Sequence, residues 1–202
     1  MLFSGLPFLY YFLPAVLVCY FAAPRKLKNA VLFVFSLIFY GWGEPRYIML
    51  MIVSIVSGFV FALMIEKKQN KKSGLILMWI SVAISLSFLL VFKYADFLIE
   101  NVNQLPGVSL PLFKLSLPIG ISFYTFQIIS YTVDVWRGDT KAQRNIISFG
   151  TYVSLFPQLI AGPIVRYTDI ERELQERKHS VTLAASGIKR FLIGLSKKVL
   201  IA

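Results

Sequence analysis

The sequence predicts an all-α, multi-pass integral membrane protein that forms one membrane domain over residues 1–202. Hydrophobic residues make up 57% of the chain and charged residues 15%, whereas soluble domains contain roughly 45–50% apolar and about 25% charged residues. The mean hydropathy is +0.69. A soluble domain of this length could not bury so much apolar surface, because its core is limited by the ratio of surface to volume. We therefore expect a lipid bilayer around the protein.

Uncharged runs give the expected membrane segments, since about 20 apolar residues cross the ~30 Å hydrocarbon core of a bilayer. The runs lie at 6–23, 30–42, 47–65, 75–92 and 117–133, followed by a broken segment at 146–165 and an amphipathic helix at 186–202. No Lys or Arg precedes Leu6, so the first run lacks the basic start of a signal peptide and predicts a retained span. The pattern amounts to about five to six membrane segments plus interfacial amphipathic helices.

The positions of Lys and Arg predict the orientation of these segments. The loops that follow the first, third and fifth segments, at 25–28, 67–72 and 137–144, contain ten Lys and Arg, and the intervening loops contain three. Because short loops rich in Lys and Arg remain in the cytoplasm, we expect the N-terminus outside. The formal net charge of +11 then indicates contact with an anionic leaflet rather than with nucleic acid.

The segment at 146–165 contains the helix breakers Pro157, Gly162 and Pro163. A complete crossing would place the eight Lys and Arg of 166–198 outside, against the orientation rule, so we expect the segment to turn back. Irregular backbone at membrane depth persists only where it is buried in protein or lines a wet cavity. Residues 156–166, with Gln158 and Arg166 as polar members, are therefore a candidate site. The alternative is a Pro-broken helix whose freed carbonyls are satisfied locally.

A polar stripe marks the fifth segment. Tyr124, Gln127, Tyr131 and Asp134 are spaced 3, 4 and 3 residues apart, which places them within roughly 80° of arc on a helix. Polar groups in membrane helices face the bundle interior or a cavity. Two interpretations stay open: hydrogen bonds between helices, or the lining of a path for substrate or an acyl chain. Asp134, near the cytoplasmic end, could also pair with Arg137.

Other chemistry is not indicated by the sequence. Metal sites need clustered His, Cys or carboxylates, and the chain has one His and one Cys, so we expect no metal site and no bound cofactor. His179 lies in a charged stretch and is predicted to be a surface residue. Ile170 and Leu174 suggest a short surface helix, and the stretch 186–202 has the apolar face and basic flanks of a helix lying in the cytoplasmic interface.

Five stretches, in order, resemble the membrane-bound O-acyltransferase family, and within it the bacterial branch around the alginate O-acetyltransferase membrane subunit. The stretches are MLFSGLPFLYYFLP, FYGWGEPRY, LPIGISFYTFQIISYTVDVWRG, FPQLIAGPIVRYTD and GIKRFLIGLSKKVLIA. The resemblance covers essentially the whole chain. It implies the N-terminal half of that fold, in the bacterial inner membrane, and transfer of an acyl group, with acetyl expected, to hydroxyls of an exported polysaccharide such as alginate.

The resemblance also implies where the catalytic residue lies and which residues line the substrate tunnel. Family members are about twice this long, and their catalytic histidine would lie beyond Ala202, so we expect an N-terminal fragment with no catalytic residue and no activity of its own. Residues Tyr124, Gln127, Tyr131, Asp134, Gln158 and Arg166 would line the substrate tunnel. The acyl donor is left open between acyl-CoA and an acyl-carrier type, and partner proteins of an O-acetylation complex are expected. The competing classes are a transporter or channel fragment and a non-enzymatic membrane scaffold that docks a partner.

Overall fold

A computed structural model describes residues 5–69, 71–105, 109–113, 116–159, 165–177 and 180–200. All regular secondary structure in these ranges is helical, which confirms the all-α membrane fold. Pro45–Lys67 and Lys72–Val102 are long and apolar enough to cross a bilayer, and Phe8–Ala22 and Ile146–Leu159 are shorter apolar helices. The expected segment at 30–42 is helical, and that at 117–133 is helical from Ile121. Neither is among the helices that are long and apolar enough to cross a bilayer, so their crossing stays a prediction.

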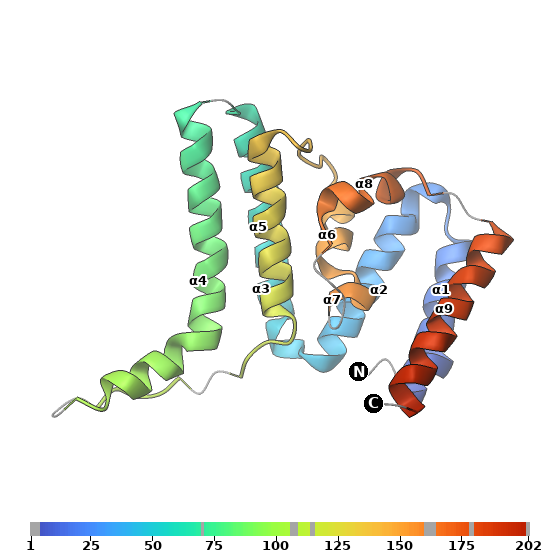
Figure 1. Cartoon of the computed structure of the whole chain (residues 1–202), viewed down its shortest axis with the longest axis horizontal. Helices are drawn as coiled ribbons and strands as arrows, with labels where there is room; N and C mark the ends of the chain where they lie inside the picture. Colours follow the sequence, from blue (N-terminus) through green and yellow to red (C-terminus); the bar gives the residue numbers. More distant parts are fainter. Residues whose placement is uncertain are drawn as a thin grey trace.

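The first three helices run alternately in opposite directions (Figure 1). A π-helical turn at Phe8–Phe12 leads into α1 (Leu13–Ala22), which is followed by α2 (Lys28–Gly43) and α3 (Ile48–Lys67). Ala23 is extended at the end of α1, as expected for a residue that precedes a proline. Short 3-10 turns at Arg25–Leu27 and Pro45–Tyr47 make the two connections.

Helix α4 (Lys72–Val102) is longer than the expected 75–92, because no helix breaker follows where the apolar run ends. Its final part bends away from the bundle (Figure 1). There the Asn103 side chain bonds to both backbone polar groups of Leu110, at 2.9 and 2.7 Å, and the Phe113 N–H donates to Asp96 at 2.8 Å. Residues 93–102, predicted as part of an external loop, are therefore helical and form one arm of a lateral hairpin.

Two glycines set the ends of α5 (Ile121–Arg137). Gly120 and Gly138 have φ of +77° and +86°, a conformation that residues with a Cβ rarely adopt. The helix therefore begins four residues later than the predicted 117 and includes Asp134 well inside its last turns. Helices α6 (Ile146–Ser154), α7 (Phe156–Leu159), α8 (Tyr167–Gln175) and α9 (Val181–Leu200) complete the described chain.

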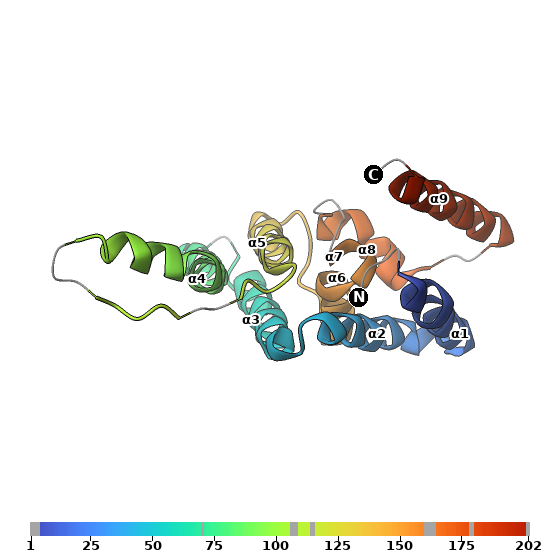
Figure 2. The same cartoon turned by 90° about the horizontal axis from the view of Figure 1, so that it is seen from below.

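Helix α9 begins earlier than predicted, at Val181 rather than at 186. Figure 1 shows it inclined along the direction of α1 and α2, and its position in the membrane interface stays a prediction. Figure 2 shows it set apart from the other helices, and none of its described residues is buried. An amphipathic pattern defines which face is apolar but not the direction of the helix axis.

The main core lies where α3, α4, α5 and α6 meet, and a smaller aromatic cluster of Phe8, Phe39 and Phe156 joins the chain start to α2 and α7. Gly58 allows α3 to approach α5, since a Cβ there would lie 2.6 Å from Ile128 Cγ2. Gly150 likewise allows α6 to approach α2, where a Cβ would meet the ring of Phe33. Small residues at such contacts are typical of packed membrane helices.

The three basic loops lie at one end of the bundle, which we call the basic end. The turns α1–α2 and α3–α4, the loop α5–α6 and helix α8 all gather there, and the turn α2–α3 lies at the opposite end (Figure 1). This alternation agrees with the charge pattern. The side of the membrane on which the basic end lies stays a prediction.

Candidate functional site in the helix bundle

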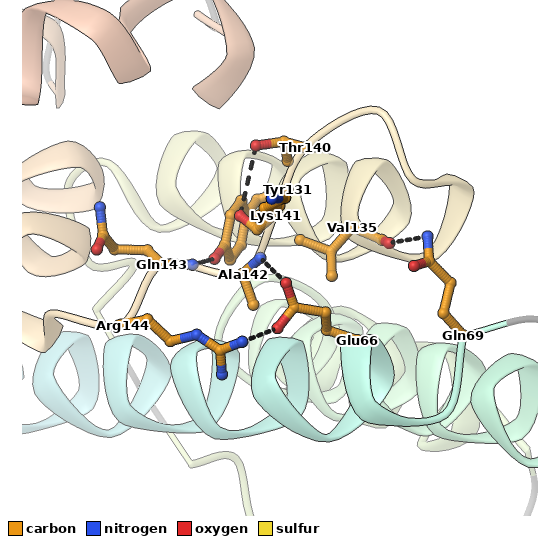
Figure 3. Close-up of polar contacts among 9 residues, drawn as sticks. All are labelled: Glu66, Gln69, Tyr131, Val135, Thr140, Lys141, Ala142, Gln143 and Arg144. Carbon is orange, nitrogen blue, oxygen red and sulfur yellow. Dashed lines mark hydrogen bonds and ion pairs between the residues drawn. The ribbon is translucent and has the colours of Figure 1, made fainter.

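The loop 138–145 is fixed to the end of α3 by Glu66 (Figure 3). One carboxylate oxygen of Glu66 accepts from the Ala142 N–H at 3.1 Å, and the other forms an ion pair with Arg144. One turn further, the Gln69 amide donates to the Val135 carbonyl at 3.3 Å. Because this loop leads from α5 into α6, these contacts set the position of α6 relative to α3.

A cluster of buried tyrosines joins α5, α6 and α8. The rings of Tyr131 and Tyr167 lie 4.9 Å apart, and those of Tyr152 and Tyr167 lie 5.2 Å apart. The Tyr131 hydroxyl accepts from the Gln143 N–H at 2.7 Å, and the Tyr167 hydroxyl accepts from the Gln143 side chain at 2.8 Å. Burial raises the pKa of Tyr167 to about 12, so this hydroxyl stays neutral at physiological pH.

Side-chain hydrogen bonds link α6, α8 and the start of α2. The Tyr152 hydroxyl donates to the Val165 carbonyl at 3.1 Å, and Tyr167 follows at the basic end, where α6 also begins. Asn29 links the same parts, since its amide nitrogen donates to Ser148 Oγ at 2.9 Å and to the Leu174 carbonyl at 3.0 Å. The start of α6 and the whole of α8 therefore lie at one end of the bundle. The predicted breakers Gly162 and Pro163 lie outside the described residues, and the turn expected within 146–165 stays a prediction.

The predicted polar stripe of α5 faces the protein interior: Tyr124, Gln127, Tyr131 and Asp134 are all buried. The Tyr131 hydroxyl has a partner, the Gln143 N–H of the loop between α5 and α6, so this hydrogen bond does not join two helices. In contrast, Gln127 Oε1 and Asp134 Oδ2 have no hydrogen-bond partner among the described residues, whereas the Tyr124 hydroxyl lies beside that of Tyr40 on α2. A buried polar group without a partner costs about 1–3 kcal/mol. These atoms are therefore the places where a water molecule or a substrate group would be stabilised.

The other two predicted residues lie toward opposite ends of this stripe. Gln158 is half-buried on α7, and its amide nitrogen has no partner among the described residues. Helix α7 contacts the start of α5, since the Leu159 carbonyl oxygen lies 3.1 Å from where a Cβ of Gly120 would be. Arg166 is exposed just before α8, where it is the strongest electrostatic neighbour of Asp134, ahead of Arg137. Gln158 thus lies near the beginning of α5 and Arg166 near its end.

Several residues of this region were not predicted from the sequence. Glu66, Gln143 and Asn29 make the contacts that hold α5, α6 and α8 together, across 12 to 145 residues of sequence. A signal existed only for Glu66, an acidic residue that closes an otherwise uncharged segment. The described residues contain no group of three His, Cys, Asp or Glu that could hold a metal. His179 lies outside the described residues.

Buried polar groups inside a bundle of apolar helices define the class: an all-α membrane protein with a polar site between its helices. No family model and no solved structure matches the chain. Curated relatives do match the chain. "Probable alginate O-acetylase AlgI" of Pseudomonas aeruginosa is 38% identical over 210 residues, covering 100% of this chain and 40% of the relative. The protein of that name from Azotobacter vinelandii is 38% identical, with 42% of the relative covered.

A "Peptidoglycan O-acetyltransferase" of Helicobacter pylori is 29% identical over 234 residues, covering 100% of this chain and 44% of the relative. Over its whole length the chain is therefore similar to proteins of the membrane-bound O-acyltransferase family, as the five sequence stretches indicated. It spans about two fifths of the length of the alginate O-acetylases it matches.

Proposed function

We propose that this chain is part of an O-acetyltransferase that transfers an acetyl group to hydroxyls of an exported polysaccharide such as alginate. The observation that carries the proposal is the match of all 202 residues to proteins named alginate O-acetylase. The further match to a peptidoglycan O-acetyltransferase supports a sugar hydroxyl outside the cytoplasm as the common acceptor. These names favour acetyl transfer over the transporter and scaffold alternatives.

In this proposal the described helices supply the wall of the path and not the reacting group. General-base catalysis on a hydroxyl needs a group with a pKa near neutrality within hydrogen-bond reach, and a neutral imidazole is the usual choice. The catalytic histidine is proposed to lie beyond Ala202. The proposed lining residues are Tyr124, Gln127, Tyr131, Asp134, Gln158 and Arg166.

The path would connect two sides of the bacterial inner membrane, with the N-terminus outside and the basic end in the cytoplasm. An acyl-CoA or acyl-carrier donor would arrive at the basic end, and the polysaccharide at the opposite end. Two buried oxygens on α5 that have no partner among the described residues, Gln127 Oε1 and Asp134 Oδ2, support this arrangement, because they offer hydrogen-bond acceptors inside the bundle. Partner proteins of an O-acetylation complex would deliver the donor or present the acceptor.

The proposal is tested with the full-length protein in a bacterial strain that exports alginate and lacks its own O-acetylase. We expect the full-length protein to restore acetyl groups on the secreted polymer, measured by proton NMR, and substitution of the downstream histidine to abolish them. The 202 residues alone should give none. Unacetylated polymer from cells that contain the intact protein and its partners would contradict the proposal, and a change in the amount of exported polymer alone would favour transport.

A further inference from the structure

A cavity of about 710 Å³ opens at the basic end, between the start of α2 and the end of α8. Arg25, Lys28 and Asn29 form one wall, and Leu174, Glu176 and Arg177 belong to the other. Three cationic side chains thus meet one carboxylate. This excess of positive charge in a concave surface favours a ligand that carries negative charge.

Hydrogen bonds hold the two walls at a fixed separation. The Asn29 amide nitrogen bridges Ser148 Oγ and the Leu174 carbonyl, at 2.9 and 3.0 Å, and Thr151 Oγ1 donates to the Asn29 carbonyl at 2.9 Å. These contacts tie α2, α6 and α8 together beneath the cavity. The cavity is therefore a built feature of the fold, and not a gap between loose loops.

Aromatic rings border the cationic groups on the side of α1. Lys28 Nζ lies 4.4 Å from the centre of the Tyr20 ring and 5.4 Å from that of Phe21, and the Arg177 guanidinium lies 5.7 Å from the Tyr20 ring. Tyrosine beside basic residues is typical of the level of lipid headgroups. The charged cavity is therefore placed at the depth where phosphates of a leaflet would lie.

An apolar surface continues from these rings along α1. Leu17, Val18 and Phe21 are 46%, 69% and 59% exposed, so the outer face of α1 has the character of a surface in contact with acyl chains. A free phosphate would use only the charged cavity. A phospholipid would use both, since its headgroup is anionic and its chains are apolar.

We propose that this cavity binds the headgroup of an anionic phospholipid of the phosphatidylglycerol type. The phosphodiester lies between Arg25 and Arg177, close to Lys28, and the acyl chains run along the exposed face of α1. The site would belong to the cytoplasmic leaflet, and this placement rests on the predicted orientation of the basic end. It is independent of the proposed acetyl transfer.

The test uses the full-length protein in detergent micelles and native mass spectrometry with added phosphatidylglycerol. The pocket variant carries Arg25→Gln and Arg177→Gln. The control variant carries Lys71→Gln and Lys72→Gln, which remove two exposed charges from the same end but not from the cavity. We expect the pocket variant to bind phosphatidylglycerol at least about tenfold more weakly, in line with the loss of two basic contacts to a headgroup, and the control to bind as the parent does.

Two further arms identify the source of the phosphate. Diacylglycerol, which has the same chains and no phosphate, should form no adduct, and millimolar inorganic phosphate should not displace the phospholipid. Arg25→Glu, a single exposed change, serves as a second variant and should weaken binding as well. Equal losses in the pocket and control variants, equal binding of diacylglycerol, or displacement by inorganic phosphate would each overturn the proposal.

Discussion

At the scale of single residues, Glu66 connects α3 to the loop between α5 and α6 through two contacts. Its two oxygens serve different partners: the Ala142 N–H, which belongs to a buried residue, and the Arg144 side chain, which is largely exposed. An exposed ion pair contributes only about 0–1 kcal/mol. The hydrogen bond to the backbone should therefore matter more than the ion pair.

This ordering predicts different effects for two substitutions. Glu66→Ala leaves the Ala142 N–H without a partner and should lower the free energy of unfolding by about 1–3 kcal/mol. Glu66→Gln retains an acceptor oxygen and should cost less. Unfolding by SDS titration in mixed micelles measures both, with Glu100→Ala, an exposed carboxylate on α4, as the control. An equal cost for Ala and Gln would show that the ion pair dominates.

At the scale of elements, the close contact between α3 and α5 depends on Gly58. A side chain there meets Ile128 at 2.6 Å, and overpacking of a tight core costs about 1–3 kcal/mol. We expect Gly58→Val to destabilise the protein by that amount in the same SDS titration. Adding Ile128→Ala should recover part of the loss, because the two positions share one contact. A double variant whose losses simply add would contradict this packing.

The sequence predicted some elements better than others, for physical reasons. The buried stripe of α5 was foreseen because the helical period places Tyr124 and Asp134 on one face, whatever the neighbours are. The extension of α4 to Val102 was missed because hydropathy ends with the apolar run, although the helix does not. The contacts of Glu66 with Ala142 and Arg144 join residues 76 and 78 positions apart, and no local pattern encodes such pairs.

At the scale of the whole molecule, the bundle has two chemically different ends. The basic end carries the three basic loops and α8, and the other carries the turn α2–α3 (Figure 1). Helices α6 and α8 both begin at the basic end, so a single orientation accounts for the three basic loops and for the basic residues of α8. The lateral hairpin of α4, which includes Ser109, belongs to the opposite end.

This arrangement predicts which positions share a side of the membrane. Cysteines at Ile146 and Thr168, both exposed, should react only with a reagent that reaches the cytoplasm, and a cysteine at Ser109 should react with an impermeant reagent from outside. The background is Cys19→Ser, because Cys19 is a free, exposed thiol. Labelling of Thr168 and Ile146 from opposite sides would mean that the broken segment crosses completely.

The central claim is that the buried polar stripe of α5 serves acetyl transfer, and Gln127 tests it most directly. Gln127→Leu keeps a side chain of similar size, removes the unpartnered Oε1, and leaves an apolar helix that should insert normally. Gln104→Leu, the same change at an exposed position of the hairpin, is the matched control. The measurement is the acetyl content of alginate secreted by cells that contain the full-length variants at equal membrane abundance.

We predict that Gln127→Leu lowers the acetyl content at least about tenfold, as expected when a group that orients a substrate is lost, and that Gln104→Leu leaves it unchanged. Full acetylation by the Gln127→Leu variant would show that the stripe only packs helices together, and would contradict the account.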